Sequence, residues 1–208
     1  MSRRQLSVGD RLAGSLLAGS LSAGCAEDPA GPLDPQTVSD LATQVGDAQG
    51  VAPSGVYAVE LTAGDCGCTD VNSALLGLTL CQGGPFGALR ADAPALQTTF
   101  DVVVSDGIVD IASEFATSNP VGAMDADGAF DAGAVIRLTS FATTGFQVTR
   151  AEGSLDPVGE SDYNIEGTLS LRLIGRVELE GLDELITEVD DIDCSESMHF
   201  SGNRYIVR

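Results

Sequence analysis

The stretch FDVVVSDGIVDI, residues 100–111, decides how the chain folds, because apolar and polar residues alternate on both sides of its central Asp-Gly pair. An Asp-Gly pair between two alternating apolar runs is the strongest short-range signal of a β-hairpin. A two-residue turn sets Ser105 opposite Ile108, and the register that follows gathers the apolar side chains on one face, namely Phe100, Val102, Val104, Val109 and Ile111. We expect this face to belong to a hydrophobic core, and the face with Asp101 and Asp110 to be wetter.

The longest alternation in the chain runs from Asn164 to Glu180 and has the same period of two. Apolar residues and glycines keep one parity through Gly175, and polar residues take the other parity. This pattern predicts either one long strand bent at Gly175 or two strands joined without a change of face. A glycine at such a bend is typical of a barrel corner or a bulge.

The remaining signals also favour strands. Turns are indicated at residues 127–128 and 144–145, and a last strand is expected over 198–207. Helical periodicity is confined to the short stretches 72–80 and 182–189. Consecutive strands with glycine-rich turns predict an all-β fold, an antiparallel meander that either closes as a lipocalin-like barrel or folds as a β-sandwich.

Composition and charge exclude several classes of protein. The 208 residues include 10 Arg, no Lys and 31 Asp or Glu, for a formal net charge of −21. Such a chain offers no basic surface for nucleic acid. A single His excludes a multi-His metal centre, and no apolar run approaches the 18 residues of a membrane-spanning helix. The 43% of hydrophobic residues is enough to build a core.

The first 24 residues have the pattern of a secretory signal peptide, with three arginines before a short stretch of Leu, Ala, Gly and Ser. The residues Ser22-Ala23-Gly24-Cys25 resemble the lipobox of bacterial lipoproteins. The leader and the composition together resemble those of lipoproteins from high-GC Gram-negative bacteria. The resemblance implies that the Cys25 thiol is diacylglycerated and that Cys25 begins the mature chain. Ser22 departs from the pattern, where Leu is usual, and ordinary cleavage near Gly24 is the alternative.

The export route has two interpretations. Residues 2–6, SRRQL, resemble the twin-arginine motif that addresses folded cargo, although Asp10 interrupts the leader; the general secretory route is the other interpretation. Both routes place the protein in the cell envelope. For a lipidated chain, the absence of Asp after Cys25 favours the outer membrane, with the domain facing the periplasm or the cell surface.

Three segments are predicted. Residues 1–24 are the signal peptide, residues 25–54 a lipid-anchored flexible tether, and residues 55–208 a single β domain. The tether is expected because the segment holds four of the eight prolines, scattered acids and no aromatic residue. A turn or two of helix is expected to begin at Pro35, marginally stable by itself.

Four further cysteines suggest that the domain is stapled by disulfides, because an even number in an exported chain is typical of structural bridges. Two pairings remain open. In one, Cys66 bonds Cys81 and Cys68 bonds Cys194; in the other, Cys66 bonds Cys194 and Cys68 bonds Cys81. Either pairing joins the first strand to the last.

No motif of a known catalytic site is present, so the chain is not predicted to be an enzyme and no cofactor is predicted. Asp125, Asp127 and Asp131 resemble part of a calcium loop, but alanines occupy two of its other ligand positions. A polar turn is the alternative for these residues. Nine acids fall between residues 178 and 196 with no base among them, and His199 is the only histidine.

Three functions follow from these features. The first is a non-catalytic, lipid-anchored envelope protein with an interaction or structural role, attached to the membrane by its N-terminus. The second is a lipocalin-like barrel that binds a small apolar ligand inside the barrel. An interior cavity of roughly 300 Å³ or more lined by apolar residues would favour this function, and a core filled by Leu and Val would favour the first. The third is a hydrolase that uses two carboxylates.

Overall fold

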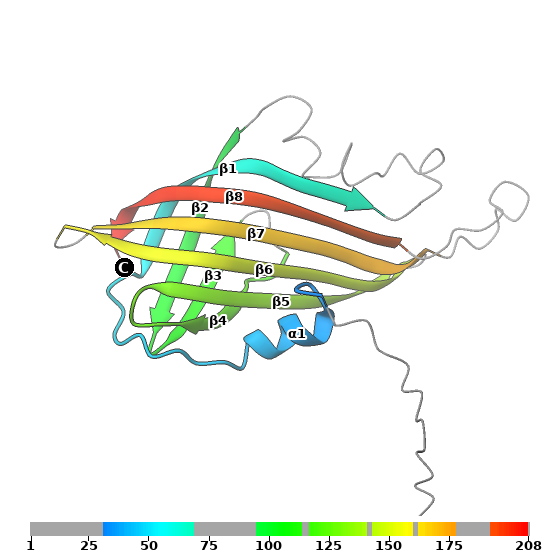
Figure 1. Cartoon of the computed structure of the whole chain (residues 1–208), viewed down its shortest axis with the longest axis horizontal. Helices are drawn as coiled ribbons and strands as arrows, with labels where there is room; N and C mark the ends of the chain where they lie inside the picture. Colours follow the sequence, from blue (N-terminus) through cyan, green and yellow to red (C-terminus); the bar gives the residue numbers. More distant parts are fainter. Residues whose placement is uncertain are drawn as a thin grey trace, which may run out of the picture.

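A computed structural model describes residues 31–68, 95–113, 117–140, 143–159, 162–177 and 192–207. These residues form one helix and eight strands (Figure 1), namely α1 (Pro35–Leu41), β1 (Gly55–Cys68), β2 (Ala95–Ser105), β3 (Ile108–Ser113), β4 (Val121–Met124), β5 (Ala129–Ser140), β6 (Thr143–Val158), β7 (Asp162–Val177) and β8 (Ile192–Val207). The two short helices expected at 72–80 and 182–189 lie outside the described residues.

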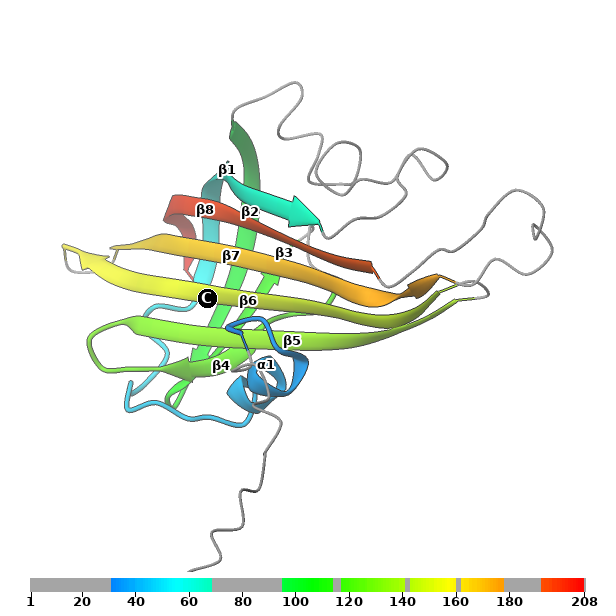
Figure 2. The ribbon, with the colours of Figure 1, turned by 45° about the vertical axis from the view of Figure 1, so that its right-hand side comes forward.

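The eight strands form one antiparallel meander, in which each strand pairs with the next along the chain. Strand β8 also pairs with β1, from Gly55 opposite Val207 to Cys68 opposite Cys194, so the sheet closes as a barrel. Figure 2 shows the long strands β5 to β8 running side by side. The predicted all-β meander is therefore confirmed, and the pairing of first and last strands is that of a barrel rather than of a sandwich.

The hairpin predicted from residues 100–111 is present as β2 and β3. Ser105 lies opposite Ile108 and Val102 opposite Ile111, as a two-residue turn requires. Asp106 and Gly107 both have positive φ, 49° and 80°, as the favoured tight hairpin turn demands. The five apolar side chains of the predicted face are each at most 2% exposed and belong to the core.

The alternation predicted from Asn164 onward forms one strand, β7, whose Ile165, Leu169 and Leu171 are buried. Gly175 lies in this strand opposite Gly145 of β6, and the strand ends at Val177. The predicted last strand is also present, but β8 begins at Ile192 and is longer than the expected 198–207.

Three phenylalanines fill the middle of the barrel. Phe200 of β8 meets Phe100 of β2 edge-on, with ring centroids 5.3 Å apart, and stacks on Phe130 of β5 at 6.4 Å. All three rings are at most 5% exposed. Gly167 of β7 leaves room for this cluster, because a Cβ at that position would lie 2.7 Å from the ring of Phe200. The centre of the barrel is thus a packed aromatic core.

Residues 31–54 differ from the flexible tether that their composition predicted. Helix α1 lies against β5 and β6 (Figure 1), with Val38 and Leu41 buried. Gly133 of β5 permits this contact, since a Cβ there would meet the side chain of Val38 at 2.5 Å. Asp34 caps the helix by accepting hydrogen bonds from two backbone N–H groups.

The segment after α1 is also held against the barrel. The N–H of Ala48 donates to the carbonyl of Met124 at 3.0 Å, and Ser54 Oγ accepts the N–H of Val104 at 2.8 Å. Prolines and small residues prevent regular structure here, but they do not prevent tertiary contacts. Only residues 25–30 of the predicted tether lie outside the described residues.

Candidate functional site

A concave site lies at the end of the barrel that carries the β2–β3 and β4–β5 turns. It is a cleft of about 790 Å³, which we call the turn-end cleft. Its lining comes from the segment before β1, from the ends of β2, β4, β6 and β7, and from the β4–β5 turn. Concave sites of this size hold small ligands in other proteins.

The floor of the turn-end cleft consists of core residues. Val104, Met124 and Leu155 line the cleft, and each belongs to the buried cluster inside the barrel with an exposed fraction of at most 3%. The packed core therefore closes the base of the cleft, and the phenylalanines fill the interior further in.

The rim of the turn-end cleft is acidic. Asp47, Asp125 and Asp127 line it, and all three residues are exposed. Asp47 Oδ1 accepts the N–H of Ala126 at 2.6 Å, and Asp127 Oδ1 accepts the N–H of Ala129 at 3.1 Å. These hydrogen bonds fix two of the carboxylates on the β4–β5 turn.

A buried arginine supports the wall opposite the rim. The guanidinium of Arg204 donates to the carbonyls of Ala52 and Ser54 and lies 4.8 Å above the ring of Tyr163. The two hydrogen bonds and the ring contact hold this wall in place, because carbonyl acceptors and a π face each stabilise a desolvated guanidinium.

Tyr57 supports the same wall from inside the barrel. Its hydroxyl donates to the carbonyl of Pro53 at 2.5 Å, and its side chain is fully buried. Burial raises the pKa of Tyr57 to about 12, although the nearby charge of Arg204 acts in the opposite direction.

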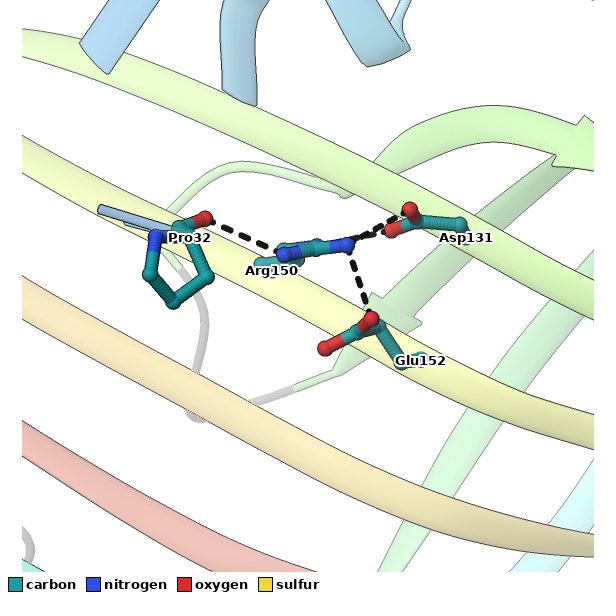
Figure 3. A network of polar contacts seen from close by, with 4 residues as sticks. All are labelled: Pro32, Asp131, Arg150 and Glu152. Atoms are coloured by element: carbon teal, nitrogen blue, oxygen red, sulfur yellow. Dashed lines mark hydrogen bonds and ion pairs between the residues drawn. The ribbon is translucent and has the colours of Figure 1, made fainter. Parts of the chain in front are cut away.

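The three aspartates of the predicted calcium loop are separated in the structure. Asp125 and Asp127 lie at the turn-end cleft, but Asp131 lies on β5, where both of its oxygens accept hydrogen bonds from Arg150 at 2.9 and 2.8 Å. Figure 3 shows that Arg150 also contacts Glu152 and the carbonyl of Pro32. The hydrogen bonding that Arg150 donates to the Asp131 carboxylate raises the pKa of Arg150. Within the described ranges, no group of three or more His, Cys, Asp or Glu residues is arranged to hold a metal ion.

A second arginine makes a similar contact next to α1. Arg172 of β7 forms two hydrogen bonds with Asp193 of β8, at 2.8 and 2.7 Å, and donates to the carbonyl of Leu33. The hydrogen bond from Arg172 lowers the pKa of Asp193. The sequence pattern showed no base within the acidic run 178–196, yet one of its acids is paired by an arginine from the neighbouring strand. Residues 178–191 of that run lie outside the described residues.

The other predicted site residues are placed as follows. Cys66 lies on β1 and Cys194 on β8, the two strands that pair at the seam of the barrel. Cys25 and Cys81 lie outside the described residues. His199 is exposed on β8, with Nδ1 3.2 Å from the hydroxyl of Thr168.

Asp47 is one of the cleft residues that the sequence analysis missed. It lies in the segment interpreted as a tether, where an isolated acid gives no signal. A direct hydrogen bond joins it to Ala126, 79 residues away in the chain. Only the folded chain brings these residues together.

Comparison of the chain with known protein families, with curated proteins and with solved structures finds no match. In the described part of the chain, no helix has the length and apolar character that crossing a membrane requires.

Proposed function

We propose that this protein is an exported, lipid-anchored envelope protein whose β-barrel is a non-catalytic module that binds a small ligand with an apolar body. The observation that carries the binding function is the turn-end cleft. Its volume of about 790 Å³ exceeds the roughly 300 Å³ that a small-molecule site needs, and its lining includes three exposed apolar residues, Ala52, Ala126 and Pro157.

A neutral apolar dye tests this proposal. N-phenyl-1-naphthylamine should bind the full mature chain with a dissociation constant on the order of 1–100 µM, as expected for an apolar molecule of this size. Ala126→Trp should weaken binding by roughly tenfold or more, because Ala126 lines the cleft and an indole there would occupy it. Ala58→Trp is the matched control, since Ala58 is exposed on β1 and does not line the cleft. Absence of dye binding, or equal binding by the two variants, would contradict the proposal.

The anchor is supported by the leader and by the lipobox-like residues that end at Cys25. Intact-mass analysis of protein extracted from membranes should show a mature chain that begins at Cys25 and carries added acyl mass. A soluble product with a free Cys25 thiol, or a mature start at another residue, would contradict lipidation.

We also propose that disulfides staple the domain by joining Cys68 to Cys194 and Cys66 to Cys81. The register of the β1–β8 ladder supports this pairing, because Cys68 lies directly opposite Cys194 and Cys66 lies opposite Glu196. Directly opposite residues have Cα atoms about 4.5–5.5 Å apart, which suits a disulfide. Diagonal neighbours are about 7–8 Å apart, which is too far for a disulfide.

A structural or protein-interaction role is the second candidate. The packed phenylalanines favour it, because they fill the middle of the barrel where many ligand-binding barrels keep a cavity. A chain that folds normally but binds no apolar dye would favour this role over ligand binding.

A further inference from the structure

The outer wall of the barrel carries an apolar patch next to the point where the described chain begins. It consists of Val135, Arg137, Phe146 and Ile174, and we call it the Phe146 patch. We propose that this patch contacts the bilayer that holds the acyl chains of Cys25, so that the barrel lies on the membrane with one fixed face. The inference rests on the lipid anchor proposed above and adds the protein surface that meets the lipid.

Strand register brings the four residues of the patch together. Phe146 of β6 lies directly opposite Arg137 of β5 and Ile174 of β7, so the three side chains share one side of the sheet. Val135 lies two residues before Arg137 and shares that side as well. This side is the exterior, because a Cβ at Gly133, two residues further back on β5, would meet the side chains of α1.

The composition of the patch differs from that of an ordinary outer wall. Strands of an antiparallel barrel usually carry polar residues on the solvated side. Here Phe146 is 40% exposed, Arg137 is exposed, and Val135 and Ile174 are half-buried. An exposed aromatic ring with aliphatic neighbours and an arginine is typical of protein surfaces that lie in the membrane interface.

The N-terminal segment is attached to the barrel at the edge of the patch. Arg172 of β7 donates to the carbonyl of Leu33 at 3.4 Å, and it lines a shallow hollow together with Gly31 and Leu33. Figure 3 shows a similar contact on β6, where Arg150 donates to the carbonyl of Pro32 at 3.2 Å. Ile174 lies two residues beyond Arg172 on the same side of β7, which is about 7 Å along the strand.

The connection from this attachment to the lipid anchor is short. Only residues 25–30 separate Cys25 from the attached segment. Even a fully extended chain of this length reaches only about 20 Å. An acyl anchor at one end and the arginine contacts at the other therefore keep this side of the barrel nearest to the bilayer. Stable membrane attachment generally combines an acyl chain with a second contact, and the Phe146 patch is placed to supply it.

The charge of the patch also suits a lipid surface. The net charge of −21 repels anionic headgroups from the molecule as a whole. In the patch itself the charged residue is Arg137, and the nearest acid on β8, Asp193, accepts two hydrogen bonds from Arg172. An arginine close to an anionic membrane surface is favourable. Repulsion of the acidic surfaces and attraction of Arg137 therefore favour the same orientation.

A single tryptophan tests which face meets the lipid, because the chain contains no Trp. Phe146→Trp is made in the full acylated mature chain, which is reconstituted into vesicles of phosphatidylcholine and phosphatidylglycerol. Thr99→Trp is the matched control, since Thr99 is exposed on β2, across the eight-strand ring from β6. Lipids brominated on their acyl chains should quench F146W and not T99W, and the emission of F146W should shift to the blue when vesicles are added.

A second pair of variants tests the contribution of Arg137. Adding R137Q to F146W should weaken the quenching on these vesicles, by up to roughly fivefold in the equilibrium between contacting and detached barrels. Adding T99D to F146W makes the same change in net charge on the far side of the barrel and should leave the quenching unchanged.

The outcomes separate this inference from the proposed anchor. If the acylated chain is bound to vesicles but F146W is quenched no more than T99W, the inference is overturned while the anchor stands. Equal loss of quenching with R137Q and with T99D would also overturn it, because the general charge would then set the orientation. If the chain carries no acyl mass and does not bind vesicles, the anchor and the inference both fail.

Discussion

Tyr57 is the residue that links the barrel interior to the wall of the turn-end cleft. Its ring is buried in the core, and its hydroxyl donates to the carbonyl of Pro53, which lines the cleft. A buried carbonyl that loses its donor is costly, because water cannot replace the hydrogen bond. The position therefore matters for stability as well as for the shape of the cleft.

Tyr57→Phe should lower the free energy of unfolding by about 1–2 kcal/mol at neutral pH, through loss of this hydrogen bond. The pH dependence should change as well. Because the pKa is about 12 in the folded state against 10 in the unfolded state, the tyrosine stabilises the fold fully below pH 10 and loses this contribution as pH rises from 10 to 12. Urea unfolding across this range should show a smaller alkaline loss for the variant than for the wild type. Identical alkaline profiles, or an unchanged stability at neutral pH, would contradict this account of Tyr57.

At the scale of elements, the seam between β1 and β8 closes the barrel. The two strands are the first and the last of the chain, and their ladder is irregular near Val56 and again between Ala63 and Cys66. A seam that joins distant parts of the chain forms at a high cost in chain entropy. A disulfide across it would remove part of that cost from folding.

Non-reducing peptide mapping of the oxidised mature chain should therefore join Cys68 to Cys194 and Cys66 to Cys81. Cys194→Ser should destabilise the domain by roughly 2–5 kcal/mol, the usual loss for a native bridge in a secreted domain. Its matched control is Ser195→Ala, since Ser195 is the exposed neighbour on the same strand. A peptide that links Cys66 to Cys194 would contradict the pairing, and free thiols at both Cys81 and Cys194 would contradict the staple.

At the scale of the molecule, the dominant property is the net charge of −21. Like charges repel within roughly a Debye length, about 8 Å at physiological ionic strength, and this repulsion disfavours the compact state. In the described residues, Arg150 and Arg172 each pair with carboxylates, but the acids of the chain outnumber its arginines by three to one.

Added salt should raise the thermal midpoint by a few degrees, because screening weakens this repulsion. Sodium and calcium chloride at matched ionic strength should act alike if screening is the whole effect. A large, saturable shift at low calcium would indicate specific binding by mass action and would contradict this prediction. In that case, loss of the shift in Asp127→Ala would place the calcium at the cleft rim, and loss in Asp190→Ala with Asp191→Ala would place it in the acidic run.

Much of the local structure was predictable from the sequence, although the turn expected at residues 144–145 is wrong, since both residues lie in strand β6 and pair with β5. The hairpin of residues 100–111 and the strand from Asn164 follow from an alternation with a period of two. Such an alternation can be recognised within a short stretch of sequence, without knowledge of the rest of the chain. The turn at Asp106 and Gly107 fixes the register of its own hairpin for the same reason. Net charge and the excluded classes of protein likewise need no knowledge of the fold.

Contacts between distant segments were decided by the tertiary structure alone. Composition marked residues 31–54 as a tether, yet Val38 and Leu41 are buried against the barrel, because β5 and β6 offer them an apolar surface that no local pattern reveals. The calcium-like spacing grouped Asp131 with Asp125 and Asp127, but Arg150 binds Asp131 on the barrel wall and Asp47 takes its place at the cleft. Pairing across the β1–β8 seam and the assembly of the cleft depend on which faces pack together, and that is a property of the closed barrel rather than of any one segment.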